Sequence, residues 1–220
     1  MRDDDQQIIK FSQEKNFDYD DFFVSKANEH IIKFFNKWPN WEKKFLNISG
    51  EKFSGKSHLI NIFLKKFKGI KFEANLFDNN KLKQIKVHQN IIIENLNNNI
   101  DEKLFYTLMN MIDQDNKYLI ITSLDTIVDI DFKLNDLKSR ANNFLLQKIE
   151  KPNDELIFAL ILKNLSDRQI FLDKKLVNYI IKRIDRSYGK IFEFIYKIDE
   201  VSLKKKKPID LKIIKEVLGE

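Results

Sequence analysis

Eight residues of this 220-residue chain match a motif that binds phosphate groups. Residues 50–57 fit the pattern G-x-x-x-x-G-K-[ST] at every fixed position, and two of the five glycines in the chain occupy its two glycine positions. In this motif backbone N–H groups and a helix N-terminus converge on phosphate oxygens, the lysine reaches the β- and γ-phosphates, and the hydroxyl binds Mg²⁺. The segment therefore predicts nucleotide binding, with Lys56 and Ser57 in the last two roles.

A second polar pair follows the strongest apolar run of the chain. Residues 91–93 are three isoleucines, and they precede Glu94 and Asn95. In ATP-hydrolysing proteins of this kind the first acid after such a strand belongs to the Mg²⁺ shell, and the second positions and deprotonates the attacking water. An amide cannot act as a general base near neutral pH, so Asn95 predicts feeble intrinsic hydrolysis. The alternative is that Glu94 only caps the strand.

The elements around these residues alternate between strands and helices. We expect strands at 44–49, 71–74, 90–94, 118–122 and 143–149, and helices at 27–35, 56–67 and 101–111. Continuous β-branched runs are typical of strands that are buried on both faces. The alternation predicts an α/β fold with a mostly parallel sheet and helices on both faces.

The pattern changes near residue 151. Beyond it we expect only helices, at 153–166, 173–184, 188–203 and 210–218. We therefore expect a flexible tail over residues 1–16, an α/β domain over 17–150 and a small all-helical domain over 151–220. The lysine run 204–207 is better explained as a solvated turn than as a binding site.

The bulk composition narrows the function classes. The chain has no cysteine, which excludes disulfides and cysteine-based metal sites, and its three histidines are far apart in sequence. We find no signal peptide and no run of about 20 apolar residues, so we expect a cytoplasmic protein without a membrane partner. The net charge of +6 could favour nucleic acid. The stronger explanation is a compositional bias toward Lys, Ile, Asn and Phe.

The motif and its surroundings resemble the AAA+ proteins of the DnaA type. From the loop to Leu59 the sequence reads Gly-Lys-Ser-His-Leu, residues 22–28 look like the adenine-side box of that family, and Thr122 falls where a sensor residue reads the γ-phosphate. Residues 136–140 are similar to a box whose last residue, here Arg140, is an arginine finger. Residues 183–188 resemble the junction between lid helices, with Arg186 in it.

The resemblance implies a P-loop AAA+ core with a five-stranded sheet and a helical lid, with ADP or ATP and Mg²⁺ as cofactors. It implies the following roles: nucleotide binding by Gly50, Ser54, Gly55, Lys56, Ser57, His58 and Val24; magnesium binding, through the nucleotide, by Ser57 and Glu94; sensing by Glu94, Asn95 and Thr122; lid contacts by Arg186 and Lys190.

The chain is still more similar to one branch of that family, the Hda-like regulators of DnaA. Proteins of this branch consist of the AAA+ module without a C-terminal DNA-binding domain, and this chain ends at Glu220, directly after the expected lid helices. They also begin with a short peptide that docks on the DNA polymerase sliding clamp. Gln7, Ile9 and Phe11 can be placed on that peptide.

Several positions depart from the family pattern. Phe53 stands in place of a usual glycine and Glu51 in place of a usual proline, both inside the phosphate-binding loop. The sensor arginine of the lid corresponds to Gly189, flanked by Lys190. Without that cation and with Asn95, we expect little self-catalysed turnover.

The resemblance thus implies a regulator that binds adenine nucleotide, tethers to the clamp and promotes hydrolysis of DnaA-bound ATP through Arg140 acting in trans. Two alternatives stay open: an AAA+ ATPase that acts as a DnaA-like or helicase-loader-like replication factor, and a nucleotide-bound scaffold in which Arg140 is an ordinary surface ion-pair residue. Self-association through AAA+ surfaces and direct contact with DNA also stay open.

Overall fold

A parallel five-stranded sheet forms the centre of the first part of the chain. The computed structural model describes residues 22–220, so the expected clamp peptide with Gln7, Ile9 and Phe11 lies outside the described residues. The sheet has the order β2-β3-β4-β1-β5, and every pair of neighbours is parallel. Its strands are β1 (Phe45–Ser49), β2 (Ile70–Glu73), β3 (Asn90–Leu96), β4 (Tyr118–Ser123) and β5 (Leu145–Lys148). Their carboxyl ends therefore lie along one edge, where open α/β sheets bind ligands.

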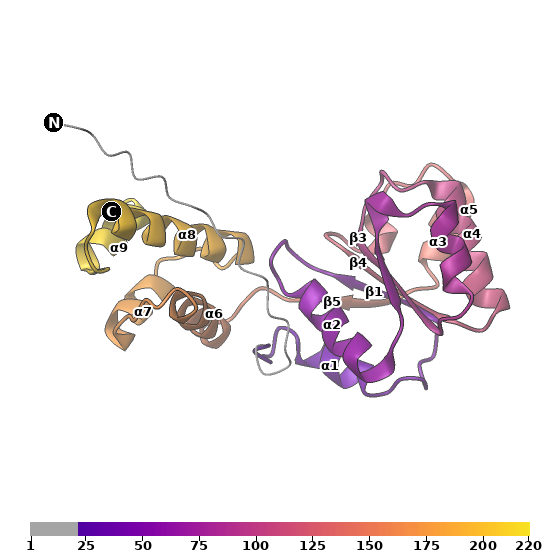
Figure 1. Cartoon of the computed structure of the whole chain (residues 1–220), viewed down its shortest axis with the longest axis horizontal. Helices are drawn as coiled ribbons and strands as arrows, with labels where there is room; N and C mark the ends of the chain where they lie inside the picture. Colours follow the sequence, from indigo (N-terminus) through magenta and orange to yellow (C-terminus); the bar gives the residue numbers. More distant parts are fainter. Residues whose placement is uncertain (1–21) are drawn as a thin grey trace.

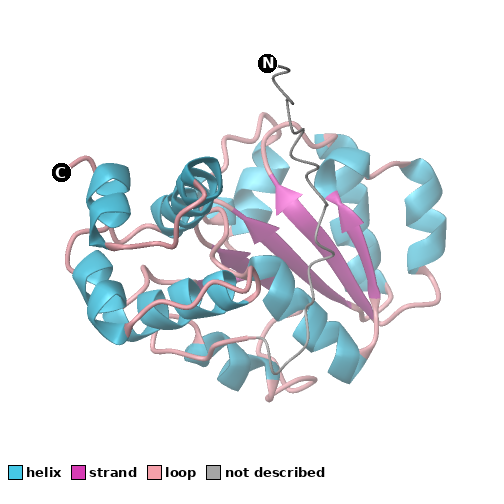
Figure 2. Cartoon of the chain, turned by 60° about the vertical axis from the view of Figure 1, so that its left-hand side comes forward, coloured by secondary structure: helices cyan, strands magenta, loops and turns pink. Residues whose placement is uncertain are grey.

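Helices cover both faces of this sheet, as Figure 2 shows. One apolar cluster joins Ile91 and Ile93 to the helices α3 (Asn79–Ile85), α4 (Glu102–Gln114) and α5 (Asn135–Ala141). A second cluster joins Ile92, on the opposite face, to α1 (Glu29–Phe35) and α2 (Lys56–Phe67). Successive strand residues point to opposite faces, so the isoleucine run of β3 is buried on both.

Four helices form a separate bundle after the sheet (Figure 1). They are α6 (Asp154–Ser166), α7 (Lys174–Ile181), α8 (Tyr188–Lys205) and α9 (Leu211–Leu218), and they share an apolar cluster of their own. The side chains of Asn153, Asp173 and Asp210 each accept a hydrogen bond from a backbone N–H of the helix that follows. These N-caps satisfy donors that have no partner within the helix, and they fix where three of the four helices begin.

The α/β fold with a parallel five-stranded sheet and a helical lid is confirmed, with small differences in the bounds. The strand expected over 143–149 is shorter, because Asn142 and Asn143 form a turn before β5. The helix expected over 173–184 ends at Ile181. The domain boundary near residue 151 stays a prediction. Within residues 22–220, no helix combines the length and the apolar character that a membrane span requires.

Candidate functional site

The loop between β1 and α2 holds the phosphate-binding motif at the carboxyl edge of the sheet. Gly55 has φ of +95°, a conformation that L side chains rarely adopt, and a Cβ there would lie 3.2 Å from the ring of Phe22. A Cβ on Gly50 would lie 3.0 Å from the Oγ of Ser54 and 3.1 Å from the Cβ of Ile149. Glycine is therefore the residue that fits at both fixed positions.

Lys56 is folded back onto this loop. Its ammonium donates hydrogen bonds to the carbonyl oxygens of Gly50, at 2.6 Å, and Glu51, at 2.8 Å. Burial lowers the pKa of Lys56 to about 8, while the negative charge of Glu51 acts in the opposite direction. Burial disfavours the charged form of a lysine, and a nearby negative charge favours it. An anion that binds in the loop would therefore stabilise the charged form of Lys56.

Two buried polar atoms near the sheet edge have no hydrogen-bond partner within residues 22–220. They are the Oγ of Ser54, in the loop, and the Oε1 of Glu94, at the end of β3. Buried polar atoms are normally satisfied, so both atoms fit a site that is completed by a polar ligand. Ser57 is half-buried and lies in the first turn of α2.

The end of β3 gathers the second group of expected residues. The Glu94 carboxylate is buried and lies 3.2 Å from the Lys71 ammonium. Asn95 has φ of 59°, in an irregularity of the strand pairing. Its backbone N–H donates to the Oγ1 of Thr122 at 3.0 Å, and its side-chain amide donates to the Oε2 of Glu73 at 2.8 Å. The structure thus brings Glu94, Asn95 and Thr122 together.

Two residues of this cluster, Lys71 and Glu73, were missed by the sequence analysis. Both lie on the edge strand β2, and Glu73 is in register with Glu94. The available signal was that residues 71–74 were expected as a strand of a parallel sheet, whose end must meet the end of β3 at the same edge.

The donor set suits magnesium that is bound through a nucleotide. No group of three or more His, Cys, Asp or Glu side chains could hold a metal ion in the part of the chain that the structure describes. Mg²⁺ usually takes only one or two protein ligands and completes its octahedron with phosphates and water. One serine hydroxyl, Ser57, and one carboxylate, Glu94, are such a set.

The segment before α1 connects the loop to a groove in the lid. The Phe22 ring lies 5.0 Å from the His58 ring, so this segment runs beside the start of α2. Phe23 lines a cavity of about 530 Å³. Its other walls come from α6, from α7 and from the residue after α7, namely Asp154, Glu155, Phe158, Ala159, Asn178, Ile181 and Lys182. Val24 is exposed and does not line this cavity.

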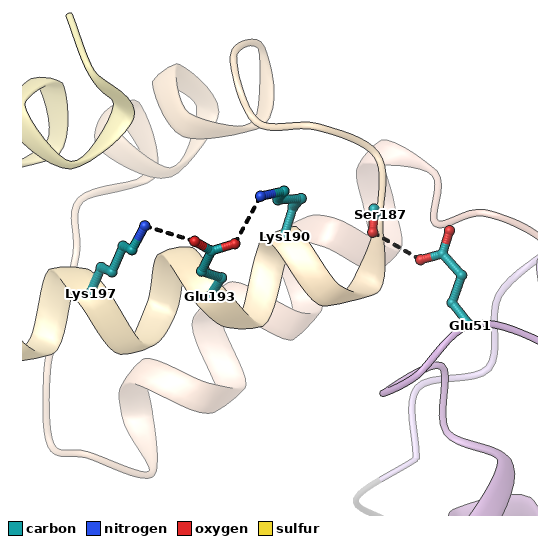
Figure 3. A network of polar contacts seen from close by, with 5 residues as sticks. All are labelled: Glu51, Ser187, Lys190, Glu193 and Lys197. Carbon is teal, nitrogen blue, oxygen red and sulfur yellow. Dashed lines mark hydrogen bonds and ion pairs between the residues drawn. The ribbon is translucent and has the colours of Figure 1, made fainter. Parts of the chain in front are cut away.

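The start of α8 meets the loop directly (Figure 3). The Oε2 of Glu51 accepts hydrogen bonds from the Oγ of Ser187 and the backbone N–H of Tyr188, both at 3.0 Å. The Phe53 ring, at the loop tip, lies 5.1 Å from the Phe192 ring of α8. Phe53 has φ of 68°, which explains why a glycine is common at this position in the family that the sequence resembles.

The two expected lid cations are both in ion pairs. Arg186 lies 2.7 Å from Asp154, one of the residues that line the groove. Lys190 lies 3.0 Å from Glu193, which also binds Lys197 at 2.7 Å. Hydrogen bonds from Lys197 and Lys190 lower the pKa of Glu193 to about 2. Lys190 is therefore paired along its own helix, as Figure 3 shows.

Arg140 lies away from these residues, at the end of α5. Its Nη1 is 3.2 Å from the Oδ2 of Asp113, and its guanidinium lies over the Tyr106 ring at 5.0 Å. Asp113 and Tyr106 belong to α4, so Arg140 packs on the face of the sheet opposite to α2. Helix α2, which follows the phosphate-binding loop, lies on the other side of the sheet (Figure 1).

Comparisons with known proteins agree with this architecture. Residues 154–218 match the family model described as the Hda lid domain. An uncharacterized protein of Haemophilus influenzae is 23% identical over 191 residues, which cover 81% of this chain and 83% of that protein.

The fold is also found in solved structures. Domain III of the Thermotoga maritima replication initiation protein DnaA superposes with a TM-score of 0.72 at 18% identity, over 92% of this chain and 95% of that one. AMPPCP-bound DnaA from Aquifex aeolicus gives 0.64 at 18% identity, over 84% and 68%. The Thermotoga maritima RuvB Holliday junction branch migration motor gives 0.66 at 11% identity, over 87% and 68%.

Proposed function

We propose that this chain, an Hda-like AAA+ protein related to DnaA, regulates the initiation of chromosomal replication by promoting hydrolysis of DnaA-bound ATP. The observation that carries the proposal is the match of residues 154–218 to the Hda lid domain, on a chain whose fold is that of DnaA domain III. In this proposal the protein works in the cytoplasm, binds ADP or ATP itself, and attaches to the sliding clamp through Gln7, Ile9 and Phe11.

The nucleotide would lie between the loop and the lid. Its phosphates would take the N–H groups of the loop and the N-terminus of α2, where Lys56 and the unpaired Oγ of Ser54 are placed. Its base would enter the groove beside Phe23, with Val24 on the segment before α1 and His58 in the first turn of α2. The Aquifex DnaA structure with AMPPCP supports this choice of ligand.

The residues at the end of β3 explain why the chain would hydrolyse its own nucleotide poorly. Ser57 and Glu94 would hold a magnesium ion on the nucleotide, and that ion would neutralise phosphate charge. Asn95 stands where the water must be deprotonated, and its amide donates a hydrogen bond rather than accepting a proton. Thr122 holds the Asn95 backbone in place.

Arg140 is suited to act on a partner's nucleotide. It lies on the face opposite to α2, and its partner Asp113 accepts a hydrogen bond from Lys44, just before β1, whereas the loop follows the other end of β1. A partly exposed ion pair of this kind contributes about 0–1 kcal/mol, so Arg140 can leave Asp113 at small cost. An arginine finger supplied in trans stabilises the charge of the transferred phosphoryl group. Contact with DnaA would use AAA+ surfaces, which could also support self-association.

A pull-down on purified sliding clamp tests the tethering part of this proposal. The full-length protein should be retained, and a variant without residues 6–11 should be lost from the clamp while it still binds ADP. Retention of the truncated variant would contradict clamp attachment through this segment.

A second candidate is an AAA+ ATPase that acts on DNA, as a helicase loader does. The Glu73 carboxylate beside Asn95 favours it, because it supplies an acid at the sheet edge. Robust turnover that DNA stimulates would support this candidate over the first.

A further inference from the structure

Glu51 joins the phosphate-binding loop to the lid through its side chain and its backbone at once. Its carboxylate caps α8, with the Ser187 hydroxyl and the Tyr188 N–H as donors, and its backbone carbonyl accepts from Lys56. Glu51 and Ser187 are separated by 136 positions in the sequence. One residue therefore contacts both the cation that would bind phosphate and the start of the longest lid helix. Figure 3 shows the second of these contacts, between Glu51 and Ser187.

The Glu51 carboxylate occupies a favourable position at the start of α8. Negative charge is stabilised at a helix N-terminus, and hydrogen bonds to a charged acceptor are strong. The charge of Glu51 also acts on the Lys56 ammonium. Phosphate groups in the loop would bring several negative charges beside this carboxylate, and like charges in a partly buried site repel strongly.

The hydrogen bonds between Lys56 and the loop carbonyls also indicate that phosphate binding would loosen the contact of Glu51 with the lid. To reach phosphate oxygens, Lys56 must release the carbonyl oxygens of Gly50 and Glu51, which it now holds at 2.6 and 2.8 Å. That release removes the restraint on the Glu51 backbone at the moment when its side chain meets the added negative charge.

We propose that Glu51 is a latch between the loop and the lid, and that nucleotide phosphates entering the loop open it. The inference rests on the proposed nucleotide binding. It adds that the Glu51 contacts hold the lid on the loop before the nucleotide arrives, and that the nucleotide releases the lid. Once the latch is open, the Tyr188 hydroxyl would still hold the start of α8, because it donates to the Glu150 carbonyl at the connection between sheet and lid.

The backbone amide of Tyr188 reports on the latch. It donates to Glu51, whereas the amide of Ile191 donates within the first turn of α8, to the Ser187 carbonyl at 3.0 Å. Hydrogen exchange of both amides, measured by NMR with and without ADP and Mg²⁺, separates latch opening from fraying of the helix. ADP should speed Tyr188 exchange about 10-fold or more and leave Ile191 exchange within about 2-fold.

Three variants separate the latch from simple charge repulsion. Glu51→Gln removes the charge and should bind ADP about 10-fold more tightly; Ser187→Ala removes one donor but keeps the charge, and should gain about 2- to 3-fold. Glu200→Gln is the matched control, because Glu200 is an acid of α8 that pairs with Lys204 on its own helix. Its ADP affinity should equal that of the wild type.

The outcomes distinguish this inference from the proposed function. ADP binding with Tyr188 protection unchanged overturns the latch and leaves nucleotide binding intact. A gain for Glu51→Gln with none for Ser187→Ala means charge repulsion alone and also overturns the latch. Failure of the wild type and of every variant to bind ADP overturns the nucleotide site itself, and the latch with it.

Discussion

Replacement of Lys56 by alanine removes the one cation that the loop holds between its own carbonyl groups. The ammonium makes two hydrogen bonds there, of 2.6 and 2.8 Å, and would exchange them for bonds to phosphate oxygens. The donor is charged in both states, so the gain is the difference between an anionic phosphate acceptor and a neutral carbonyl acceptor. If the net gain equals one hydrogen bond to a charged group, about 1.5–3 kcal/mol, we expect a loss of about 10- to 150-fold in ADP affinity.

Calorimetric titration with ADP and Mg²⁺ at pH 7 measures this loss. Lys52→Ala is the matched control, because it removes the same charge from the same loop, but its ammonium lies over the Phe53 ring at 5.2 Å and not on the loop carbonyls. Its affinity should fall by about 3-fold or less, as expected for a charge screened by solvent. Thermal unfolding should change little in either variant.

Equal ADP affinity of the wild type and Lys56→Ala would refute this reasoning. The same holds if Lys52→Ala loses as much affinity as Lys56→Ala, because the effect would then reflect net charge and not the geometry of the loop.

Three further outcomes follow from the same contacts. Burial lowers the pKa of Lys56 to about 8, so the side chain is charged below that pH and loses its charge above it. ADP affinity measured across pH 7–9.5 should therefore fall as pH rises. In Lys56→Arg the affinity should stay level, because the charge of arginine persists over this range. With Asn95 and Gly189 at the two catalytic positions, steady-state phosphate release should be far below about 1–100 s⁻¹; a turnover in that range would refute the assignment. Gln7→Ala combined with Phe11→Ala should abolish clamp binding in a pull-down without changing ADP affinity, and unfolding of that variant would mean that the segment belongs to the core.

The sequence predicted the sheet well, since its central strands are continuous apolar runs with both faces buried. Residues 90–94 and 118–122 could be placed within one or two positions of β3 and β4. The helices α3 and α5 were not anticipated, because each is seven residues long and buries few side chains: Ile85 alone in α3, and Leu137 and Ala141 in α5. A helix without an apolar stripe gives no periodic signal.

The site was predictable where it depends on a local motif and not where it depends on distant contacts. Residues 50–57 are read directly from their spacing. The ion pair of Lys71 with Glu94 and the cap of Glu51 on α8 join segments that no local pattern relates. Glu51 could be noted only as a departure from a family pattern, and its partners became visible once the lid was placed beside the loop.

Hydrolysis of ATP bound to purified DnaA, in the presence of clamp loaded on DNA, tests the central claim most directly. The account predicts that the wild-type chain speeds this hydrolysis and that Arg140→Ala abolishes the effect, since a finger contributes about 10³–10⁵ in rate. Arg140→Lys should rescue poorly, because an ammonium lacks the planar fork of the guanidinium. If Arg140→Ala stimulates DnaA as fast as the wild type, Arg140 is only the partner of Asp113, and the proposed mechanism is wrong.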